Sequence, residues 1–430
     1  MIKQVLKDVV VAILTWEAKL VLKKYNPRIV AVTGSVGKTS TKDAIFSTLS
    51  HFHFTRRSEK SFNSELGVPL TILGCPTGWN NPFAWLKIII EGLILVLIPN
   101  NYPDWLVLEI GADRPYDIKK ITEWIKPDVV VITRLSKVPV HVEFFPSPED
   151  VVREKGYLVQ ALKRDGVLIL NSDDEDVRNY ATLVSDVKIM YYGMQNSDVL
   201  GTEYALYEER DVPRGVTFQV TVEDHTEKVT IEGGLGKQVM YPALAAIAVG
   251  VSQGITLKKV ADTIRKHEPT PGRMNIIEGL KDTILIDDTY NSSPVALHEA
   301  LETLKVIRAK GRKIAVLGDM LELGMYSSAE HKKAGEHAAQ VVEILITVGI
   351  RSRGIAEGAL SSGMSEENIF QFDKPREAGK HLQSLLLSGD VVLIKGSQGV
   401  RMEKTVEEVM LHPEKKDSLL VRQGSAWQQR

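Results

Sequence analysis

The feature that most constrains this chain is a short glycine-containing loop between a strand and a helix. Segment 33–40 (TGSVGKTS) follows the β-branched run Arg28–Thr33 and precedes a stretch of helical composition at 41–50. Glycines let the backbone wrap around an anion, and the N–H groups of a helix start supply positive potential. The spacing departs from the usual phosphate loop, because Val32 stands where a further glycine is expected. Its place after a buried strand still predicts a nucleotide-phosphate site rather than an incidental turn.

Each residue type in this loop suits a phosphate site. The Lys38 ammonium would reach the β- and γ-phosphates of ATP, and the Thr39 hydroxyl would hold Mg²⁺. The candidate nucleotide-binding residues of the loop are therefore Gly34, Ser35, Val36, Gly37, Lys38, Thr39 and Ser40.

Short apolar runs alternate with helical segments from residue 28 onward, which indicates a mostly parallel α/β sheet. Beyond 28–33, strands are expected at 105–110, 128–133 and 166–170. Thr, Val and Glu alternate between 201 and 233, which predicts a small antiparallel addition. Two helices are expected next, at about 241–252 and 257–266.

A hinge is predicted at 268–272 (EPTPG), because two prolines and a glycine stop any regular element. After it the alternation restarts, with strands expected at 284–287, 313–317, 342–348 and 390–394, and helices at 295–308 and 329–340. The predicted organisation is an N-terminal helix over 1–27, an ATP-binding α/β domain over 28–268, a Rossmann-like α/β domain over 269–411, and a frayed tail over 412–430.

Composition excludes several classes of function. The 430 residues are 43% hydrophobic and 25% charged, as in soluble globular proteins. The formal net charge of -2 offers no basic field for nucleic acid. A single cysteine, Cys75, excludes an intramolecular disulfide and a multi-cysteine zinc site, and it fits the reducing cytoplasm.

Two apolar segments raise the question of membrane contact. Residues 1–24 place Ile2, Val5, Leu6 and further apolar residues at helical spacing, but charges interrupt the run and no cleavage site follows. An amphipathic helix docked on the body is favoured, with an interfacial membrane helix as the alternative. Segment 83–98 is broken by Lys87 and Glu91 and is shorter than the ~20 residues of a spanning helix. It predicts a buried or partner-covered helix, with peripheral membrane contact left open.

The short loop resembles that of the Mur ligase family and its relatives, the folylpolyglutamate and poly-γ-glutamate synthetases. Other stretches extend the resemblance over about 28–408, most closely to the branch that adds D-alanyl-D-alanine to UDP-N-acetylmuramoyl-tripeptide. The matching stretches are 63–69 (NSELGVP), 108–112 (LEIGA), 141–143 (HVE), 286–294 (IDDTYNSSP), 316–324 (VLGDMLELG) and 395–397 (KGS).

Three residues are candidates for metal binding and catalysis beside Lys38 and Thr39. Glu109 ends an apolar strand at the carboxyl edge where α/β sheets bind ligands, so it is expected to hold Mg²⁺. An isolated histidine such as His141 is more often a satisfied loop residue, and a helix lysine such as Lys155 is more often solvated. The resemblance implies instead that His141 helps bind a second Mg²⁺ and that Lys155 is carbamylated.

The resemblance also assigns residues beyond the hinge. It implies that Arg273 contacts the nucleotide phosphates when the domains close, that Asp288 contacts the ATP ribose and that Lys395 acts at the interdomain cleft. A hinge salt bridge and a solvated turn are the plainer interpretations of Arg273 and Asp288. The candidate substrate-binding residues are Asn63, Tyr290, Asn291 and Lys395.

Three departures from the family pattern stand out. Fewer than forty residues precede the loop, so the family's N-terminal domain, which binds the UDP-sugar, is expected to be absent. The segment that helps to hold adenine in the family reads 238–242 (QVMYP) here, and Pro242 has no amide side chain. Ser293 and Gln398 replace a family asparagine and arginine, which bears on amine specificity.

The function implied is an ATP- and Mg²⁺-dependent ligase of cell-wall peptidoglycan precursor synthesis. A carboxylate would attack the γ-phosphate of ATP, and an amino acid or a D-alanyl-D-alanine-like dipeptide would then displace phosphate from the acyl phosphate. The acceptor would be a small molecule or a lipid-linked carboxylate. A ligase of another polymer, of the poly-γ-glutamate or folylpolyglutamate type, and a catalytically silent nucleotide-binding protein are the alternatives.

Overall fold

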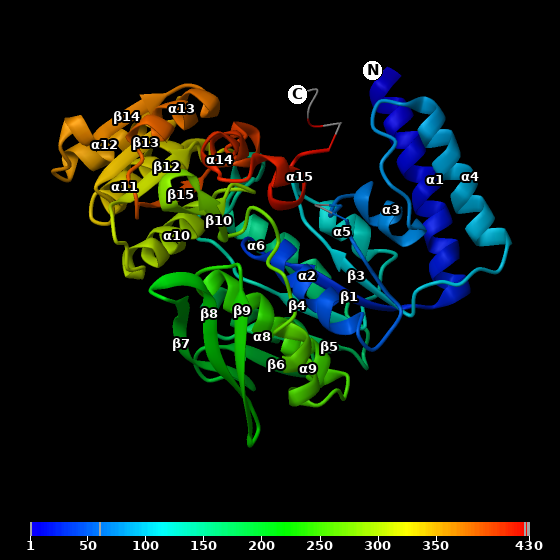
Figure 1. The fold of residues 1–430 in the computed structure, drawn as a ribbon. Helices are drawn as coiled ribbons and strands as arrows, with labels where there is room; N and C mark the ends of the chain where they lie inside the picture. The colour runs from blue at the N-terminus through cyan, green and yellow to red at the C-terminus, as the bar shows by residue number, and fades with distance from the viewer. Residues whose placement is uncertain (1, 60–61, 425–426, 428–430) are drawn as a thin grey trace.

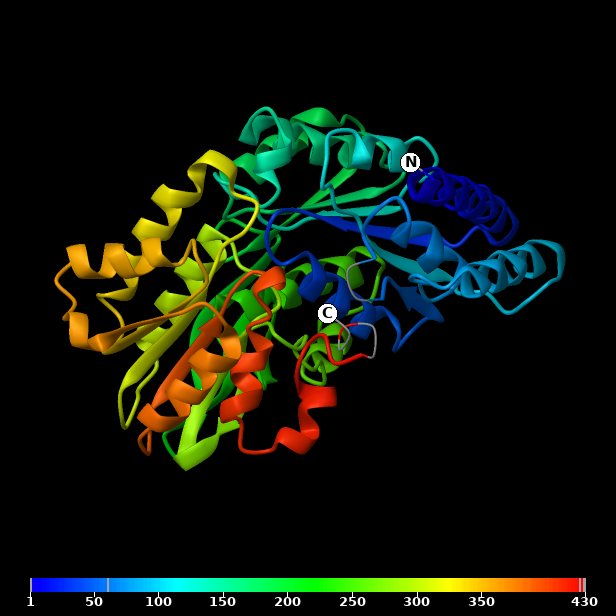
Figure 2. The ribbon, with the colours of Figure 1, turned by 90° about the horizontal axis from the view of Figure 1, so that it is seen from above.

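The computed structural model describes residues 2–59, 62–424 and 427, and for residues 2–6 the backbone alone. Among these residues the chain forms two mainly parallel β-sheets, each with helices on both faces (Figure 1, Figure 2). This is the mixed α/β architecture that the alternation of strands and helices predicts.

The first sheet has the strand order β2-β3-β1-β4-β5-β6-β7-β8-β9 within the described residues. All pairs from β2 to β7 are parallel, and β7, β8 and β9 pair antiparallel. The antiparallel addition expected at 201–233 is therefore present, and it continues the main sheet. The bounds are β1 Arg28–Thr33, β2 Thr55–Arg57, β3 Trp105–Glu109, β4 Val129–Ile132, β5 Val167–Asn171, β6 Lys188–Gly193, β7 Val199–Glu209, β8 Val212–Val222 and β9 His225–Glu232.

Helices pack on the two faces of this sheet and bury two separate apolar cores. Helices α2, α8 and α9 cover one face, and α1, α3, α4, α5 and α6 lie on the other. The bounds are α1 Ile2–Tyr25, α2 Lys38–Leu49, α3 Gly67–Leu73, α4 Pro82–Leu97, α5 Asp117–Thr122, α6 Pro148–Gln160, α7 Glu175–Arg178, α8 Lys237–Ser252 and α9 Leu257–Ile264.

The second sheet has the order β10-β11-β15-β12-β13-β14 within the described residues, parallel except for the edge strand β10. The bounds are β10 Asn275–Gly279, β11 Thr283–Asp288, β12 Lys313–Gly318, β13 Ile344–Val348, β14 Ile369–Phe372 and β15 Val391–Lys395. Its helices are α10 Pro294–Val306, α11 Ser327–Ala338, α12 Arg353–Ser361, α13 Pro375–Leu385, α14 Glu403–Val409 and α15 Lys416–Leu419.

No helix or strand interrupts the expected hinge, because α9 ends at Ile264 and β10 begins at Asn275. Thr270 in this connection donates a hydrogen bond of 2.8 Å from its hydroxyl to Asp43 of α2. The connection therefore contacts the helix that follows the phosphate loop.

The C-terminal segment differs from the expected frayed tail. Residues 413–419 form two short helical turns, and Leu420 is buried against the second domain. The Arg422 guanidinium donates to the carbonyl oxygens of Thr289 and Tyr290 at 2.7 and 2.9 Å. Buried apolar surface and these hydrogen bonds outweigh the polar composition of the segment.

The first apolar segment forms α1, which packs against α3 and α4 and buries Leu14, Ala18 and Val21 completely. Helix α1 therefore packs on the body of the protein, and the side chains of Ile2, Val5 and Leu6 lie outside the described residues. Helix α4 buries only one face, at Ile88, Gly92 and Leu95. The expectation of a buried helix holds for that face alone.

Candidate functional site

The phosphate loop turns sharply between β1 and α2, and its glycines are required by the backbone. Gly34 and Gly37 have φ of 147° and 85°, which favour glycine. A Cβ at Gly34 would also lie 2.0 Å from the Thr133 hydroxyl oxygen. The N–H groups of Ser35 and Val36 donate to the Arg134 carbonyl oxygen at 2.6 and 3.2 Å, which fixes the loop to the end of β4.

The first turn of α2 directs its N–H groups and Lys38 into the cleft between the two sheets. The Lys38 ammonium donates to the Gly34 carbonyl oxygen at 2.9 Å, so its side chain folds over the loop. Burial lowers the pKa of Lys38, and the nearby Glu109 carboxylate opposes that shift. Thr39 is buried beside it. The loop thus presents a cation, a hydroxyl and a helix N-terminus to one anion site.

Glu109 is the last residue of β3 and lies opposite Val32 in the strand that leads into the loop. The side chain is buried. Its Oε1 accepts a hydrogen bond of 3.1 Å from the Asn63 amide, and its Oε2 is buried without a hydrogen-bond partner among the described residues. Carboxylate oxygens left in this way are costly unless a ligand or a cation completes them. The donor set therefore fits a hard cation at this point.

His141 meets the second sheet's domain across the cleft. Its Nδ1 lies 2.6 Å from the Glu322 Oε2, and its Nε2 lies 3.5 Å from the Asp113 Oδ1. His141 and Glu322 both have left-handed backbone conformations, with φ of 71° and 63°. Within the described residues no cluster of three or more acidic, histidine or cysteine side chains is arranged to hold a metal.

Lys155 is not the solvated helix lysine that composition favours. It lies on α6, whose N-terminus is capped by Ser147, and its side chain is buried. Burial and the Lys38 cation lower the pKa of Lys155 to about 7. The amine is thus substantially neutral near pH 7, which makes it a nucleophile.

The second domain contributes a buried ion pair at the edge of its sheet. Asp288 and Lys395 end the neighbouring parallel strands β11 and β15 and face each other in register. The Lys395 ammonium lies 2.5 Å from the Asp288 carboxylate and donates to the Asn291 carbonyl oxygen at 3.0 Å. Lys395 therefore fixes the loop that follows β11.

Two arginines lie over Tyr290 in that loop. The Arg273 guanidinium is 4.0 Å from the ring centroid of Tyr290, and that of Arg422 is 6.0 Å from it. Arg273 also acts on Lys38 as a like charge. Arg273 thus reaches toward the phosphate loop from the far side of the hinge, as a closed arrangement of the two domains requires.

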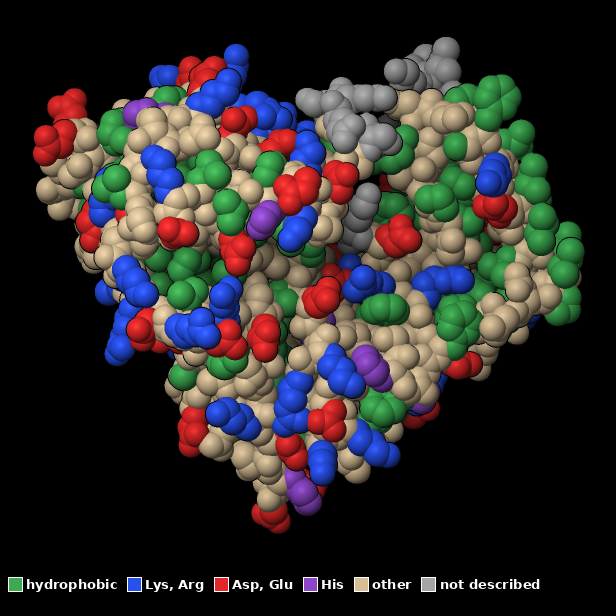
Figure 3. All heavy atoms as spheres, viewed as in Figure 1, with side chains coloured by type: hydrophobic (Ala, Val, Ile, Leu, Met, Phe, Trp, Pro, Cys, Tyr) green, Lys and Arg blue, Asp and Glu red, His purple; other side chains and the backbone are tan. Residues whose placement is uncertain are grey.

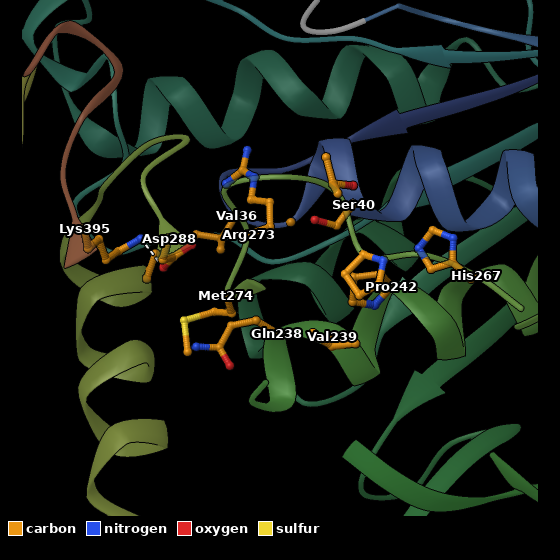
Figure 4. A pocket seen from close by; sticks show the side chains of 14 residues that line it. Val36, Ser40, Gln238, Val239, Pro242, His267, Arg273, Met274, Asp288 and Lys395 are labelled. Carbon is orange, nitrogen blue, oxygen red and sulfur yellow. Dashed lines mark hydrogen bonds and ion pairs between the residues drawn. The ribbon is translucent and has the colours of Figure 1, made fainter. Parts of the chain in front are cut away.

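A narrow pocket adjoins the loop on the side of α8 (Figure 4). Pro242, Val239 and Gln238 lie on α8, and Asp288 and Lys395 face them from the second domain. The Gln238 Oε1 accepts a hydrogen bond of 3.4 Å from Thr303, while its Nε2 is buried without a partner among the described residues. The pocket offers apolar walls and one unused amide donor.

The structure brings most of the predicted site residues into one cavity of about 690 Å³ between the domains. The predicted residues that line it are Ser35, Val36, Gly37, Lys38, Thr39, Asn63, Glu109, His141, Arg273, Tyr290 and Asn291. Ser40, Asp288 and Lys395 line the narrow pocket beside it. Gly34, within the loop, and Lys155, on α6, are not among the lining residues of either cavity.

Several further residues line the cavity without having been predicted as site residues, and three of them are charged. Asp113, Glu322 and Arg401 line the cavity, and Asp113 and Glu322 lie on either side of His141. Glu322 stands within the matching run 316–324, and Asp113 follows the run 108–112 directly. Their places within and beside these matching runs could have identified Glu322 and Asp113 as site residues from the sequence.

Comparison with known proteins identifies the family to which the chain belongs. The family profiles for the Mur ligase middle domain and for the Mur ligase glutamate ligase domain match residues 92–250 and 272–398. Among solved structures, the MurF ligase of Thermotoga maritima in complex with ADP superposes with a TM-score of 0.76 at 26% identity, covering 93% of this chain and 83% of that one.

Two curated relatives are UDP-N-acetylmuramoyl-tripeptide–D-alanyl-D-alanine ligases. That of Bacillus subtilis is 28% identical over 397 residues, which cover 92% of this chain and 79% of the relative. That of Mycobacterium leprae is 30% identical over 397 residues, which cover 86% of this chain and 71% of the relative. With the two profiles, the fold and the loop geometry, these matches show that the chain belongs to the Mur ligase family.

Proposed function

We propose that this protein is an ATP-dependent, ADP-forming ligase that joins a carboxylate to an amino acid or a D-alanyl-D-alanine-like dipeptide in peptidoglycan precursor synthesis. One observation carries the proposal. The phosphate loop with Lys38 and the incompletely paired Glu109 carboxylate lie in the same cavity as Arg273, Tyr290 and Asn291 of the other domain. In this proposal the cavity would hold a phosphoryl donor and an acceptor between two domains that close on each other.

In this proposal ATP spans the loop and the narrow pocket. Its phosphates lie on the first turn of α2, where Lys38 neutralises charge on the transferring group. Its ribose lies beside Asp288. Its adenine lies against Val239 and Pro242, where the unpartnered Gln238 amide donor takes the place of the family's asparagine. The domain that binds ATP would extend over 28–268, and the domain that closes on it over 269–411.

Magnesium would be held by Glu109 and Thr39, with His141 near a second ion. The buried Oε2 of Glu109 is the oxygen that supports this assignment. A cation held there would offset negative charge on the phosphates and so favour attack by a carboxylate. Mg²⁺ is commonly held by one or two carboxylates together with substrate phosphates, so the small protein donor set suits it.

Lys155 would be carbamylated. Its neutral amine would attack CO₂: a C–N bond forms, the electron pair of one C–O π bond moves to oxygen and one proton leaves, which gives an anionic carbamate beside Lys38. The lowered pKa supports this step, because only the neutral amine is nucleophilic. The product would remove the repulsion between Lys38 and Lys155 and would supply a second carboxylate near the metal.

The acceptor carboxylate would lie near Asn63, and the amine near Tyr290 and Asn291, whose loop is fixed by Lys395. The carboxylate attacks the γ-phosphate and ADP leaves. The amine then attacks the acyl carbon, phosphate leaves and an amide forms. Closure around Arg273 would exclude water, which would otherwise hydrolyse the acyl phosphate.

We further propose that the enzyme works in the cytoplasm, on a soluble or a lipid-linked acceptor, at or near a membrane. A poly-γ-glutamate-type or folylpolyglutamate-type activity is not favoured. The curated relatives reported above act on D-alanyl-D-alanine by name, whereas the folylpolyglutamate synthase of Mycobacterium tuberculosis complexed with ADP shares 14% identity and shows the fold alone.

The test is phosphate release from ATP and Mg²⁺ with candidate acceptors, with and without D-alanyl-D-alanine. UDP-N-acetylmuramoyl-tripeptide, a lipid-linked muramoyl-tripeptide and a folate with L-glutamate make the three arms. Release that requires a muramoyl acceptor and D-alanyl-D-alanine together supports the proposal. Release only with the folate arm overturns the substrate class, and no acceptor-dependent release in any arm overturns the ligase.

A further inference from the structure

The outward face of α4 is a continuous apolar row. Phe83, Leu86, Ile90, Ile94 and Leu97 follow one another at helical spacing, and their exposed fractions are 81, 55, 47, 47 and 76%. A surface helix of a soluble domain ordinarily shows polar residues on this side. Exposed apolar patches of this kind mark an interaction site. Figure 3 shows apolar side chains gathered along the edge of the molecule that α4 forms in Figure 1.

The inner face of the same helix is already in use. Gly92 lies so close to α1 that a Cβ there would be 2.2 Å from a Glu17 carboxylate oxygen. Ile88 and Leu95 are buried on the same side. Helix α4 is therefore already packed on α1 through its inner face, and the exposed row is not the face that contacts α1. It is a second apolar face on a helix that is correctly packed.

Charge distinguishes the possible occupants of this face. Beside the row, Lys87 and Glu91 form an ion pair of 3.7 Å, so their two charges cancel. Segments 2–25 and 82–98 contain six lysines and three acids, a net charge of +3, whereas the whole chain carries -2, which leaves -5 elsewhere. Exposed Trp16 and Trp79, 53 and 42% accessible, lie in and beside these helices. Tryptophan and lysine around an apolar row are the residues favoured at a lipid headgroup interface.

We infer that the α4 face and the basic α1 beside it dock on the surface of an anionic lipid bilayer. The helix would lie in the plane of the interface, and no helix of the described residues is long and apolar enough to cross the bilayer. A second copy of the chain is disfavoured, because a two-fold contact would set one positively charged helix pair against another. Figure 1 and Figure 2 place α1 and α4 at the end of the molecule remote from the second sheet, so docking leaves the domains free to close.

This inference does not rest on the ligase chemistry, because binding to vesicles requires neither ATP nor an acceptor. The experiment is flotation of the full chain with phosphatidylcholine vesicles that contain about 30% phosphatidylglycerol, and with phosphatidylcholine alone. We expect the chain to float with the anionic vesicles, and at least about tenfold less with the neutral ones.

The variant Leu86→Glu/Ile90→Glu places two charges in the row and should reduce flotation at least about tenfold. The matched control is Ile350→Glu/Leu387→Glu, which puts the same charges at exposed apolar positions of the second domain, 76 and 58% accessible. A milder pair, Leu86→Ser/Ile90→Ser, keeps the test valid if the charged variant unfolds, as circular dichroism would show.

Three outcomes would overturn the inference. One is a wild-type chain that stays unbound with both kinds of vesicle. Another is equal loss of binding in the row variants and in the folded control. The third is a wild-type dimer in sedimentation velocity that the serine pair converts to a monomer without any vesicle binding, which would assign the face to a second copy.

Discussion

The two sides of the interdomain cavity hold their buried charges in opposite ways. On the side of the second domain, Lys395 and Asp288 neutralise each other at 2.5 Å. On the side of the phosphate loop, Lys38 and Lys155 are buried close enough to repel, and one oxygen of Glu109 lacks a partner among the described residues. The first arrangement is complete without ligand, and the second is not.

This difference indicates on which side of the cavity bound ligands supply the missing charge partners. Buried charges that remain unpaired are expensive, so a protein keeps them where a bound group supplies the missing partner. ATP phosphates, a metal and a carbamate would complete the loop side. On the second domain the Lys395–Asp288 pair needs no such partner, whereas the Asp287 Oδ2 and the Arg273 Nε are, like the Glu109 Oε2, buried without one among the described residues. Matching lysine substitutions on the two sides should therefore have different consequences.

The largest expected effect is on stability, from Lys395→Met. The change leaves the Asp288 carboxylate buried without its cation, which costs about 3–5 kcal/mol of unfolding free energy. Urea unfolding measures it. The double variant Lys395→Met/Asp288→Asn should recover part of the loss, because no charge is then stranded. If the single variant were as stable as wild type, the pair would not be the fixed element that the comparison requires.

The matched change on the other side, Lys38→Met, should act on turnover. Loss of one preorganised cation costs about 10²–10³-fold in kcat for transition states of this kind. Unfolding free energy should change by less than about 1 kcal/mol, since the hydrogen bond to Gly34 and the attraction to Glu109 are lost, while the cost of burying the Lys38 cation is removed. Acceptor-dependent phosphate release measures the expected loss of turnover, and urea unfolding measures the expected small change in stability. Unchanged turnover would remove Lys38 from the ATP site.

Sequence reasoning was most successful where local chemistry and fold coincide. The strand, glycine and helix pattern at 28–50 required a loop at the carboxyl edge of a parallel sheet, and Glu109 followed from the next apolar strand. The central strands of both sheets and helix α1 were predictable for the same reason, whereas β2, β6, β10 and β14 were not predicted. The hydrophobic period of the chain determines which elements form and which of their faces are buried.

What the sequence could not supply were contacts between distant segments. Composition gave Lys155 as a solvated residue, and only packing shows that it is buried beside Lys38. The pairing of His141 with Glu322 joins two domains across the cavity, so no local pattern encodes it. The C-terminal segment was expected to fray because it is polar, but the site for Arg422 is made by carbonyl oxygens of a loop more than a hundred residues earlier.

A smaller and pH-dependent effect is expected at Lys155. Carbamate formation needs the neutral amine, so with a pKa of about 7 the modified fraction at fixed dissolved CO₂ should rise between pH 6 and 8. Activity should follow it, and removal of CO₂ and bicarbonate should lower activity more at pH 6.5 than at pH 8. Lys155→Ala should lose about tenfold or more, with partial recovery in acetate, whose carboxylate replaces the carbamate.

Stability gives an independent check on the same lysine. Its folded pKa lies below the unfolded value of 10.5, so the unfolded chain binds more protons between about pH 7 and 10.5. Without CO₂, wild-type stability should therefore rise with pH in that window, and Lys155→Met should flatten the rise. A wild-type profile that is already flat would contradict the buried, neutral amine.

The smallest effect should come from Glu322→Gln, which tests the contact that joins the two sides. Glu322 and His141 are each about a third exposed, at 40 and 32%, so solvent screens the pair and it is worth about 0.2–1 kcal/mol. That corresponds to a loss of about 1.4-fold to fivefold in kcat/KM, and the loss should shrink at high salt. Glu357→Gln, which removes an exposed ion pair with Lys332 elsewhere on the second domain, should change neither kcat/KM nor its dependence on salt. A loss of kcat/KM equal to that of Lys38→Met would mean that Glu322 takes part in the reaction itself. The contrast between the incompletely paired charges around the phosphate loop and the complete Lys395–Asp288 pair would then not extend to this residue.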